Sequence, residues 1–269
     1  MEKIIAVDKK EEIIALASEI IYEQKPDWCN ATMRSLKLSL LWPRSYFPYD
    51  TKEKYPLLIW ICGGGFAGVD QNVWIPEMVY FAKKGYAVAS LSYSVKDETR
   101  YPEPEMEVKS AIRYLRAHAE DYHIKTDKII IMGESAGGYL SVFTGLTNGD
   151  KQYETGENMD IDSSVQGVIA WYPVIYPFEE TAPKISALPD LSQMVTKKAP
   201  PFLIFHGLAD KVVPYEQSKK LYYTLQECGV PADLYLIDGA EHGDQHFVQE
   251  SIKEIMLRFV QNIFEESKK

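Results

Sequence analysis

The sequence predicts an α/β fold in which a mostly parallel central sheet is covered by helices on both faces. Short, wholly apolar runs such as 57–61 and 129–132 alternate with longer stretches of helical periodicity. Strands that are apolar on both sides are typical of a parallel sheet enclosed by helices. The alternation continues to the C-terminus without a repeat, so we expect residues 1–269 to form a single domain. A chain of 269 residues, 46 % of them hydrophobic, is long enough to bury one large core.

The first fifty residues, 1–50, are expected to contain a helix and a leading strand. A helix is predicted over 11–24, because its apolar residues recur at helical spacing and form one stripe of Ile13, Ile14, Ala17, Ile20 and Ile21. The pattern breaks at Pro26. Beyond that residue, polar positions alternate with leucines, which predicts a half-buried strand that includes Leu36, Leu38 and Leu40.

From residue 57 onward we expect strands and helices in alternation. The predicted strands are apolar runs at 57–61, 86–91, 129–132, 165–171, 202–205 and 234–237. The predicted helices are a stretch that ends at 84, then 103–119, a helix that ends near 149, 214–227 and 247–265. The stretch 172–201 carries six prolines and no regular pattern. Because a loop of about 30 residues in a compact domain is usually functional, we expect this insertion to form a short lid.

Composition narrows the classes of partner. With 29 basic and 39 acidic residues the net charge is -10, so the protein repels nucleic acids and anionic membranes, and neither is expected as a partner. Three cysteines are too few for a disulfide framework or a zinc site. The N-terminal residues lack the apolar run of a signal peptide, and the longest such run, 57–62, is far shorter than a membrane span. The sequence favours a cytoplasmic protein, either a monomer or a homodimer.

A candidate nucleophile lies where a predicted strand turns into a helix. The segment Gly133-Glu134-Ser135-Ala136-Gly137 directly follows the run 129–132 and matches the pattern G-x-S-x-G. Its small residues permit a sharp bend that lifts the serine hydroxyl out of the sheet, at the edge where parallel sheets form their active sites. We therefore interpret Ser135 as a nucleophile. The alternative is a glycine-rich turn that serves packing alone.

A serine nucleophile needs a base, and His242 is the best candidate. It lies in the small-residue loop 238–243, just past the last predicted strand. His246 is its competitor, and the two histidines at i, i+4 also raise the alternative of a metal site. No further ligands stand at a recognisable spacing, so we expect no metal. His206 closes the run 202–205 and is expected to support the turn there rather than to react.

The base in turn needs an acid that orients it. Asp210 follows the strand at 202–205 and precedes a predicted helix. Asp238 is the rival, but it stands only four residues before His242, and reaching the imidazole from there would need a tight hairpin. We favour Asp210, which gives the chain order Ser, Asp, His that is typical of one class of serine hydrolases.

A glycine loop follows the strand at 57–61. Cys62-Gly63-Gly64-Gly65-Phe66 allows a close approach of the backbone to a ligand, with its N–H groups turned inward. Beside a serine nucleophile, the N–H groups of Gly64, Gly65 and Ala136 would form an oxyanion hole. The alternative, a phosphate-binding loop, fits poorly because the spacing matches neither G-x-G-x-x-G nor the P-loop.

Taken together, these segments resemble the α/β-hydrolase superfamily, and more closely its esterases and lipases with an HGGG-type oxyanion loop. That group includes acetyl and feruloyl esterases and enzymes similar to hormone-sensitive lipase. The resemblance runs from about residue 55 to the C-terminus. It rests on the glycine loop, the elbow at 133–138, the lead-in 126–129, Tyr101-Pro102, 114–116, 206–210, Val213-Pro214 and Glu241-His242-Gly243.

One residue departs from the family pattern. The family's loop begins with histidine, and here Cys62 stands in its place. In the family that histidine is understood to brace the loop through hydrogen bonds, which a thiol makes poorly. We expect the glycine donors to survive with a different brace. The alternative that Cys62 is itself a nucleophile is weak, because no histidine lies near it in sequence.

The resemblance implies an α/β-hydrolase fold and a serine ester hydrolase that acts on short acyl esters of a small molecule without a cofactor. Acetylated or feruloylated plant carbohydrates are its implied substrates. The alternatives are an amide-cleaving relative, such as an arylformamidase or a prolyl-peptidase-like enzyme, and a non-catalytic binding protein. Side chains near the predicted nucleophile and at the start of the insertion are candidates for substrate contact, with core packing as the alternative for the last four: Phe66, Glu134, Trp171, Tyr172, Tyr176 and Phe178.

Overall fold

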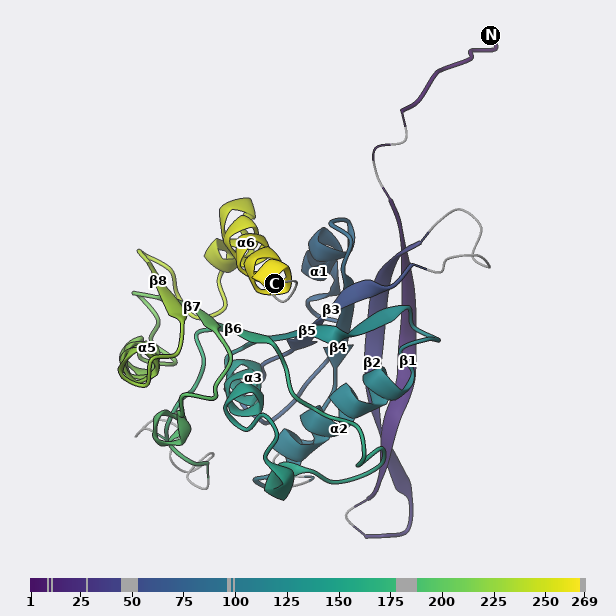
Figure 1. Ribbon diagram of the computed structural model, residues 1–269. Helices are drawn as coiled ribbons and strands as arrows, with labels where there is room; N and C mark the ends of the chain where they lie inside the picture. The colour runs from purple at the N-terminus through teal and green to yellow at the C-terminus, as the bar shows by residue number, and fades with distance from the viewer. Residues whose placement is uncertain are drawn as a thin grey trace.

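The computed structural model describes residues 1–8, 10, 12–27, 29–44, 53–95, 98, 100–177 and 188–266. The described residues form an eight-stranded sheet of order β1-β2-β4-β3-β5-β6-β7-β8 (Figure 1). Strand β2 runs antiparallel to β1 and β4, and all other neighbours pair in parallel. The strands are β1 (Ile13–Pro26), β2 (Met33–Arg44), β3 (Tyr55–Ile61), β4 (Ala87–Leu91), β5 (Ile124–Glu134), β6 (Gly167–Trp171), β7 (Phe202–Gly207) and β8 (Ala232–Ile237).

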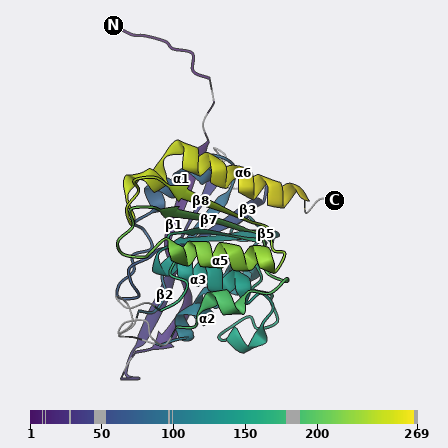
Figure 2. The ribbon, with the colours of Figure 1, turned by 90° about the vertical axis from the view of Figure 1, so that its left-hand side faces the viewer.

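Helices cover both faces of the sheet, as Figures 1 and 2 show. One layer holds α1 (Ile75–Ala82) and α6 (Glu250–Glu266), and the other holds α2 (Glu103–Ala117), α3 (Ala136–Leu146) and α5 (Glu216–Glu227). Short 3₁₀ turns are η1 (Lys151–Tyr153), η2 (Leu191–Met194) and η3 (Gln245–Val248). The predicted α/β-hydrolase fold is confirmed.

The apolar strands supply both layers of the core. Along β3, Leu57, Ile59 and Ile61 belong to the core cluster under α2, α3 and α5. Leu58 and Trp60 belong to the cluster under α1 and α6. Successive side chains of a strand point to opposite faces, so a strand buried on both faces must be apolar at every position. This requirement explains why β3 and β5 were recognisable as uninterrupted apolar runs.

The N-terminal segment corrects the sequence prediction, because 13–26 is the strand β1 and not a helix. It pairs with β2 through two irregularities, one of which lies between Ala17 and Ile20, where Glu19 has a φ of 61°. Extra residues in a bulge shift the alternation of inward and outward side chains. The inward residues Ala17 and Ile20 are therefore three positions apart, a spacing that also occurs on one face of a helix, whereas Ile13 and Ile21 of the predicted stripe are exposed.

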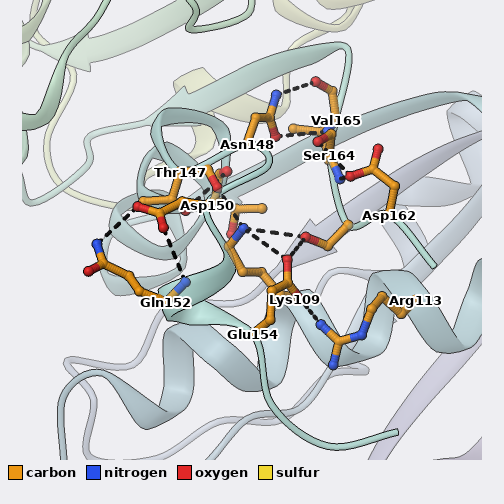
Figure 3. Close-up of polar contacts among 12 residues, drawn as sticks. Lys109, Arg113, Thr147, Asn148, Asp150, Gln152, Glu154, Asp162, Ser164 and Val165 are labelled. Carbon is orange, nitrogen blue, oxygen red and sulfur yellow. Dashed lines mark hydrogen bonds and ion pairs between the residues drawn. The ribbon is translucent and has the colours of Figure 1, made fainter. Parts of the chain in front are cut away.

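A buried polar cluster ties the connection between α3 and β6 to α2 (Figure 3). Lys109 of α2 donates to the Thr147 carbonyl at 2.8 Å, and its Nζ lies 3.6 Å from Oε1 of Glu154. Arg113, one turn further along α2, pairs with the same carboxylate. Both cations are fully buried, and Glu154 lies within ion-pair distance of each. This cluster ties the C-terminal end of α3 and the connection that follows it to α2.

We predict that Glu154→Gln destabilises the protein by about 3–5 kcal/mol, because it leaves two buried cations without a carboxylate partner. Urea unfolding followed by circular dichroism measures the change. Glu157→Gln is the matched control, since Glu157 lies in the same connection with an exposed side chain and contacts Arg113 only through its carbonyl. The control should stay within about 0.5 kcal/mol of the native protein. Equal stabilities for the two variants would contradict the role given to Glu154.

Candidate active site

Ser135 lies at the turn between β5 and α3, directly after the carboxyl end of β5. Its backbone has a φ of 53° and a ψ of -118°, a conformation that non-glycine residues rarely adopt. Its N–H donates to the Trp171 carbonyl at 3.0 Å, which fixes the turn against β6. A Cβ added to Gly137 would lie 2.1 Å from the Ile61 carbonyl oxygen, so this position accepts only glycine. The close packing of α3 on β3 thus holds the serine in its strained turn.

Ser135, His242 and Asp210 form a continuous chain of hydrogen bonds. The Nε2 of His242 lies 3.0 Å from the Ser135 hydroxyl. Its Nδ1 lies 2.7 Å from Oδ2 of Asp210. Because a carboxylate only accepts, the imidazole donates from Nδ1, and Nε2 is left to accept the proton of the serine. The structure therefore brings together the three residues that the sequence singled out, from the ends of three different strands.

The surroundings of Asp210 keep its carboxylate charged. Its Oδ1 accepts the N–H groups of Val212 at 2.8 Å and Val213 at 2.9 Å. Burial by itself raises the pKa of Asp210, but hydrogen bonds from two histidines and a backbone N–H outweigh it and hold the pKa well below its usual range. The rival Asp238 has an exposed side chain in the turn after β8. Asp210 is thus the carboxylate that contacts the imidazole.

The other two candidate histidines occupy different places. His206 is fully buried, donates from Nε2 to the Val213 carbonyl at 2.9 Å and accepts the Ser218 hydroxyl at Nδ1 over 2.6 Å. Its Nε2 also lies 3.3 Å from Asp210, so it braces the turn that presents this carboxylate. His246 is partly exposed and pairs with Asp244. Among the described residues, no group of three or more His, Cys, Asp or Glu side chains is arranged to hold a metal ion.

The glycine loop after β3 leaves N–H groups free to bind an anion. Gly64 and Gly65 have φ values of 138° and 61°, and within the described part of the chain their N–H groups meet no acceptor. The loop is tightly folded: a Cβ on Gly64 would lie 1.8 Å from the Gly68 carbonyl oxygen, so no larger residue fits. Free backbone N–H groups are the kind of donor that stabilises a developing oxyanion in serine hydrolases.

Cys62, at the start of this loop, has an unreactive environment. Its side chain is 3 % exposed and its Sγ lies 3.8 Å from the Ser90 hydroxyl. Burial raises the pKa of the thiol to about 12, which leaves almost no thiolate at neutral pH. This environment does not suit a nucleophile.

Two of the residues expected to contact substrate make contacts within the protein near Ser135. Glu134 accepts the Gly63 N–H at 2.5 Å through Oε1. The ring of Tyr172 lies 4.5 Å from the imidazole of His242, and the side chain is fully buried. Tyr172 therefore confines the imidazole from one side. No local sequence pattern indicates these contacts, because each joins residues at least 70 positions apart.

The remaining candidates for substrate contact have separate outcomes. Phe66 is 8 % exposed and packs edge-on against Tyr139 of α3, at the rim of the glycine loop. Trp171 is 1 % exposed, with its ring 5.0 Å from Trp60, which favours the alternative of core packing for this residue. Tyr176 lies under Lys220, whose Nζ is 4.6 Å from its ring centre. Phe178 lies outside the described residues.

The fold, together with a serine elbow, a carboxylate and a histidine that follow one another along the chain, defines an α/β-hydrolase. More narrowly, the chain belongs to the BD-FAE family, whose model matches residues 45–183 and 179–225. None of the helices in the described ranges is both long and apolar enough to cross a membrane.

Individual proteins are also similar to this chain in sequence or in fold. Esterase LipC from Mycobacterium tuberculosis is 29 % identical over 227 residues, which cover 76 % of this chain and 56 % of LipC. The chain spans about half the length of the curated relatives it matches. Among solved structures, a truncated carbohydrate esterase from gut microbiota has a TM-score of 0.75 and 24 % identity, covering 95 % of this chain and 98 % of that one. Thermogutta terrifontis esterase 2 has a TM-score of 0.77 at 24 % identity, with coverages of 91 % and 94 %.

We predict that iodoacetamide at about pH 8 alkylates Cys29 of the native protein and leaves Cys62 unmodified. Cys29 is exposed, whereas only about 10⁻⁴ of the buried Cys62 thiol is ionised when its pKa is about 12. Peptide mass spectrometry reads the modification at each site, and unfolding in urea before alkylation is the control that should expose both. Alkylation of native Cys62 as fast as that of Cys29 would revive its role as a nucleophile.

Proposed function

We propose that this protein is a serine carboxylic ester hydrolase in which Ser135 is the nucleophile, His242 the general base and Asp210 the orienting acid. The observation that carries the proposal is the chain of hydrogen bonds of 3.0 Å and 2.7 Å that joins the three side chains. The names of the relatives, which are esterases, support the same reaction class.

The geometry supports a two-step reaction through an acyl-enzyme. His242 takes the hydroxyl proton of Ser135 at Nε2 while the serine oxygen attacks the ester carbonyl. The carbonyl oxygen becomes an oxyanion, which accepts hydrogen bonds from the N–H groups of the glycine loop. When the intermediate collapses, the carbon–oxygen bond to the alcohol breaks and Nε2 returns the proton to the leaving alkoxide. In the second step His242 takes a proton from water, which attacks the acyl-enzyme carbonyl. The bond to the Ser135 oxygen breaks, the proton returns to that oxygen, and the acid is released.

Two features of the site lower the barrier to this reaction. In this proposal the N–H groups of Gly64, Gly65 and Ala136 form the oxyanion hole, and because backbone donors are part of the fold before the reaction begins, stabilising the oxyanion requires little reorganisation. The Asp210 carboxylate remains charged because its pKa lies well below the usual range, and it stabilises the imidazolium that forms when His242 takes the proton. Removing one oxyanion donor in a serine hydrolase costs about 10²–10³ in kcat, which sets the scale for this contribution.

The substrates we propose are esters of short acyl groups, with acetylated or feruloylated plant carbohydrates as the natural class. The support is steric. Tyr172 closes the site on the histidine side and Phe66 on the side of the glycine loop. Both described ends of the insertion, through Ile175 and Leu191, are buried against the core and joined by a backbone hydrogen bond of 2.9 Å. These anchored ends support our proposal that the insertion forms a short lid, which would suit a small acyl group.

We predict that Ser135→Ala folds normally and loses ester hydrolysis by about 10⁴-fold or more. A fluorophosphonate probe should label the native protein at Ser135 and leave the variant unlabelled. Circular dichroism of both proteins is the folding control. Activity retained within about tenfold, or labelling at another residue, would eliminate Ser135 as the nucleophile.

We predict that rates on p-nitrophenyl esters are highest from acetyl to butyryl and decline beyond about eight carbons. Each further methylene that stays in water forfeits about 0.8 kcal/mol of burial. The panel should include acetylated and feruloylated xylo-oligosaccharides, which test the proposed alcohol separately from the acyl length. Rates that rise through the dodecanoyl ester would rule out a short lid over the acyl pocket.

A further inference from the structure

The glycine loop needs an anchor outside itself. Gly63, Gly64 and Gly65 carry no side chains that could pack or bond, and the last two are exposed. An oxyanion hole works only if its donors are fixed within a few tenths of an ångström. The usual brace is missing, because Cys62 presents a buried thiol whose contact with the Ser90 hydroxyl is 3.8 Å long.

We propose that Glu134 is the positioning residue that anchors this loop and thereby aligns the oxyanion donors. Its Oε1 accepts two N–H groups, from the Gly63 backbone at 2.5 Å and from Nε1 of Trp74 at 3.3 Å. These donors stand at the two ends of the connection between β3 and α1. Glu134 directly precedes Ser135. A single carboxylate oxygen therefore ties both ends of this connection to the backbone that carries the proposed nucleophile.

The Glu134 carboxylate packs closely against the glycine loop. A Cβ added to Gly63 would lie 2.6 Å from each carboxylate oxygen, so the carboxylate is packed directly on the glycine backbone. A second anchor acts from the other side, where the Tyr93 hydroxyl donates to the Cys62 carbonyl at 2.9 Å. The peptide unit between Cys62 and Gly63 is therefore held at both its carbonyl and its N–H. The orientation of this peptide plane is therefore fixed, and the glycine loop continues from it.

The chemistry of the carboxylate suits this role better than substrate contact. A hydrogen bond from an N–H to a charged oxygen is roughly twice as strong as one to a neutral oxygen. Burial raises the pKa of Glu134, while the Gly63 N–H, His242 and Trp74 oppose that rise by stabilising the charged form. A carboxylate already engaged by two donors of its own chain is poorly placed to bind a substrate as well. The contact orders the loop and touches no reacting atom.

The inference rests on the proposed function, and its test compares Glu134→Ala with Glu134→Gln. Alanine removes the acceptor, so kcat for p-nitrophenyl acetate should fall by about 10- to 100-fold with KM changed less than about twofold. Glutamine keeps an oxygen that accepts both N–H groups and should stay within about fivefold of the native kcat. Inhibition by a trifluoromethyl ketone, whose adduct carries the oxyanion, should weaken in parallel with kcat.

A matched control and a readout without substrate complete the test. Glu241→Ala removes an exposed carboxylate beside His242 and should leave kcat within about twofold. Hydrogen exchange of the peptide that contains Gly63 should accelerate in Glu134→Ala and remain slow in Glu134→Gln. If the alanine variant fails to fold, Trp74→Phe, which removes one of the two donors, should produce part of the same loss in kcat.

Three results would overturn the inference: a native kcat in Glu134→Ala, a raised KM with unchanged kcat, or equal losses for alanine and glutamine. The second result would make Glu134 a substrate-binding residue. Failure of the native protein to hydrolyse esters or to react with the fluorophosphonate would refute the proposed function instead. In that case the exchange of the Gly63 N–H still decides whether Glu134 anchors the loop.

Discussion

The site depends on one backbone constraint, the left-handed conformation of Ser135 in the turn between β5 and α3. A non-glycine residue in such a conformation costs about 1–3 kcal/mol and persists only where its surroundings determine it. Here the surroundings are the Trp171 carbonyl, which binds the Ser135 N–H, and the contact of Gly137 with the Ile61 carbonyl. Since α3 packs this closely on β3, the serine hydroxyl and the loop that follows β3 are fixed relative to each other.

The parallel sheet brings the other groups to the same edge. Strands β7 and β8 pair with their ends aligned, Gly207 opposite Ile237, so the turns that follow them leave the sheet side by side. Asp210 and His242 lie three and five residues beyond these ends, and this short reach allows a contact of 2.7 Å between residues 32 positions apart. His206 contacts the Asp210 carboxylate, and the ring of Tyr172 packs against the imidazole of His242, so both groups are confined. Pre-organisation of the triad is thus a property of strand register as much as of the side chains themselves.

The sequence allowed the prediction of those features that depend on local pattern. The buried strands stood out as apolar runs, and the elbow as glycines around a serine, because each requirement falls within a few residues. Two kinds of feature escaped. The pattern of strand β1 predicts a helix, since its bulge near Glu19 alters the alternation that identifies a strand. The contacts of Glu134 with Gly63 and of Lys109 with Glu154 join distant segments, and nothing in the local sequence indicates such partners.

Ser135, His242 and Asp210 are proposed to act as one chain of hydrogen bonds, and replacing the carboxylate separates this arrangement from its alternative. Steady-state kinetics of Asp210→Asn and Asp238→Asn on p-nitrophenyl acetate compare the bonded carboxylate with an exposed one close to the same histidine. We expect Asp210→Asn to lower kcat by about 10⁴-fold, because an amide in this place favours the wrong tautomer of the imidazole, and Asp238→Asn to change it less than about twofold. A larger loss in Asp238→Asn, or equal losses in both, would contradict the proposed arrangement.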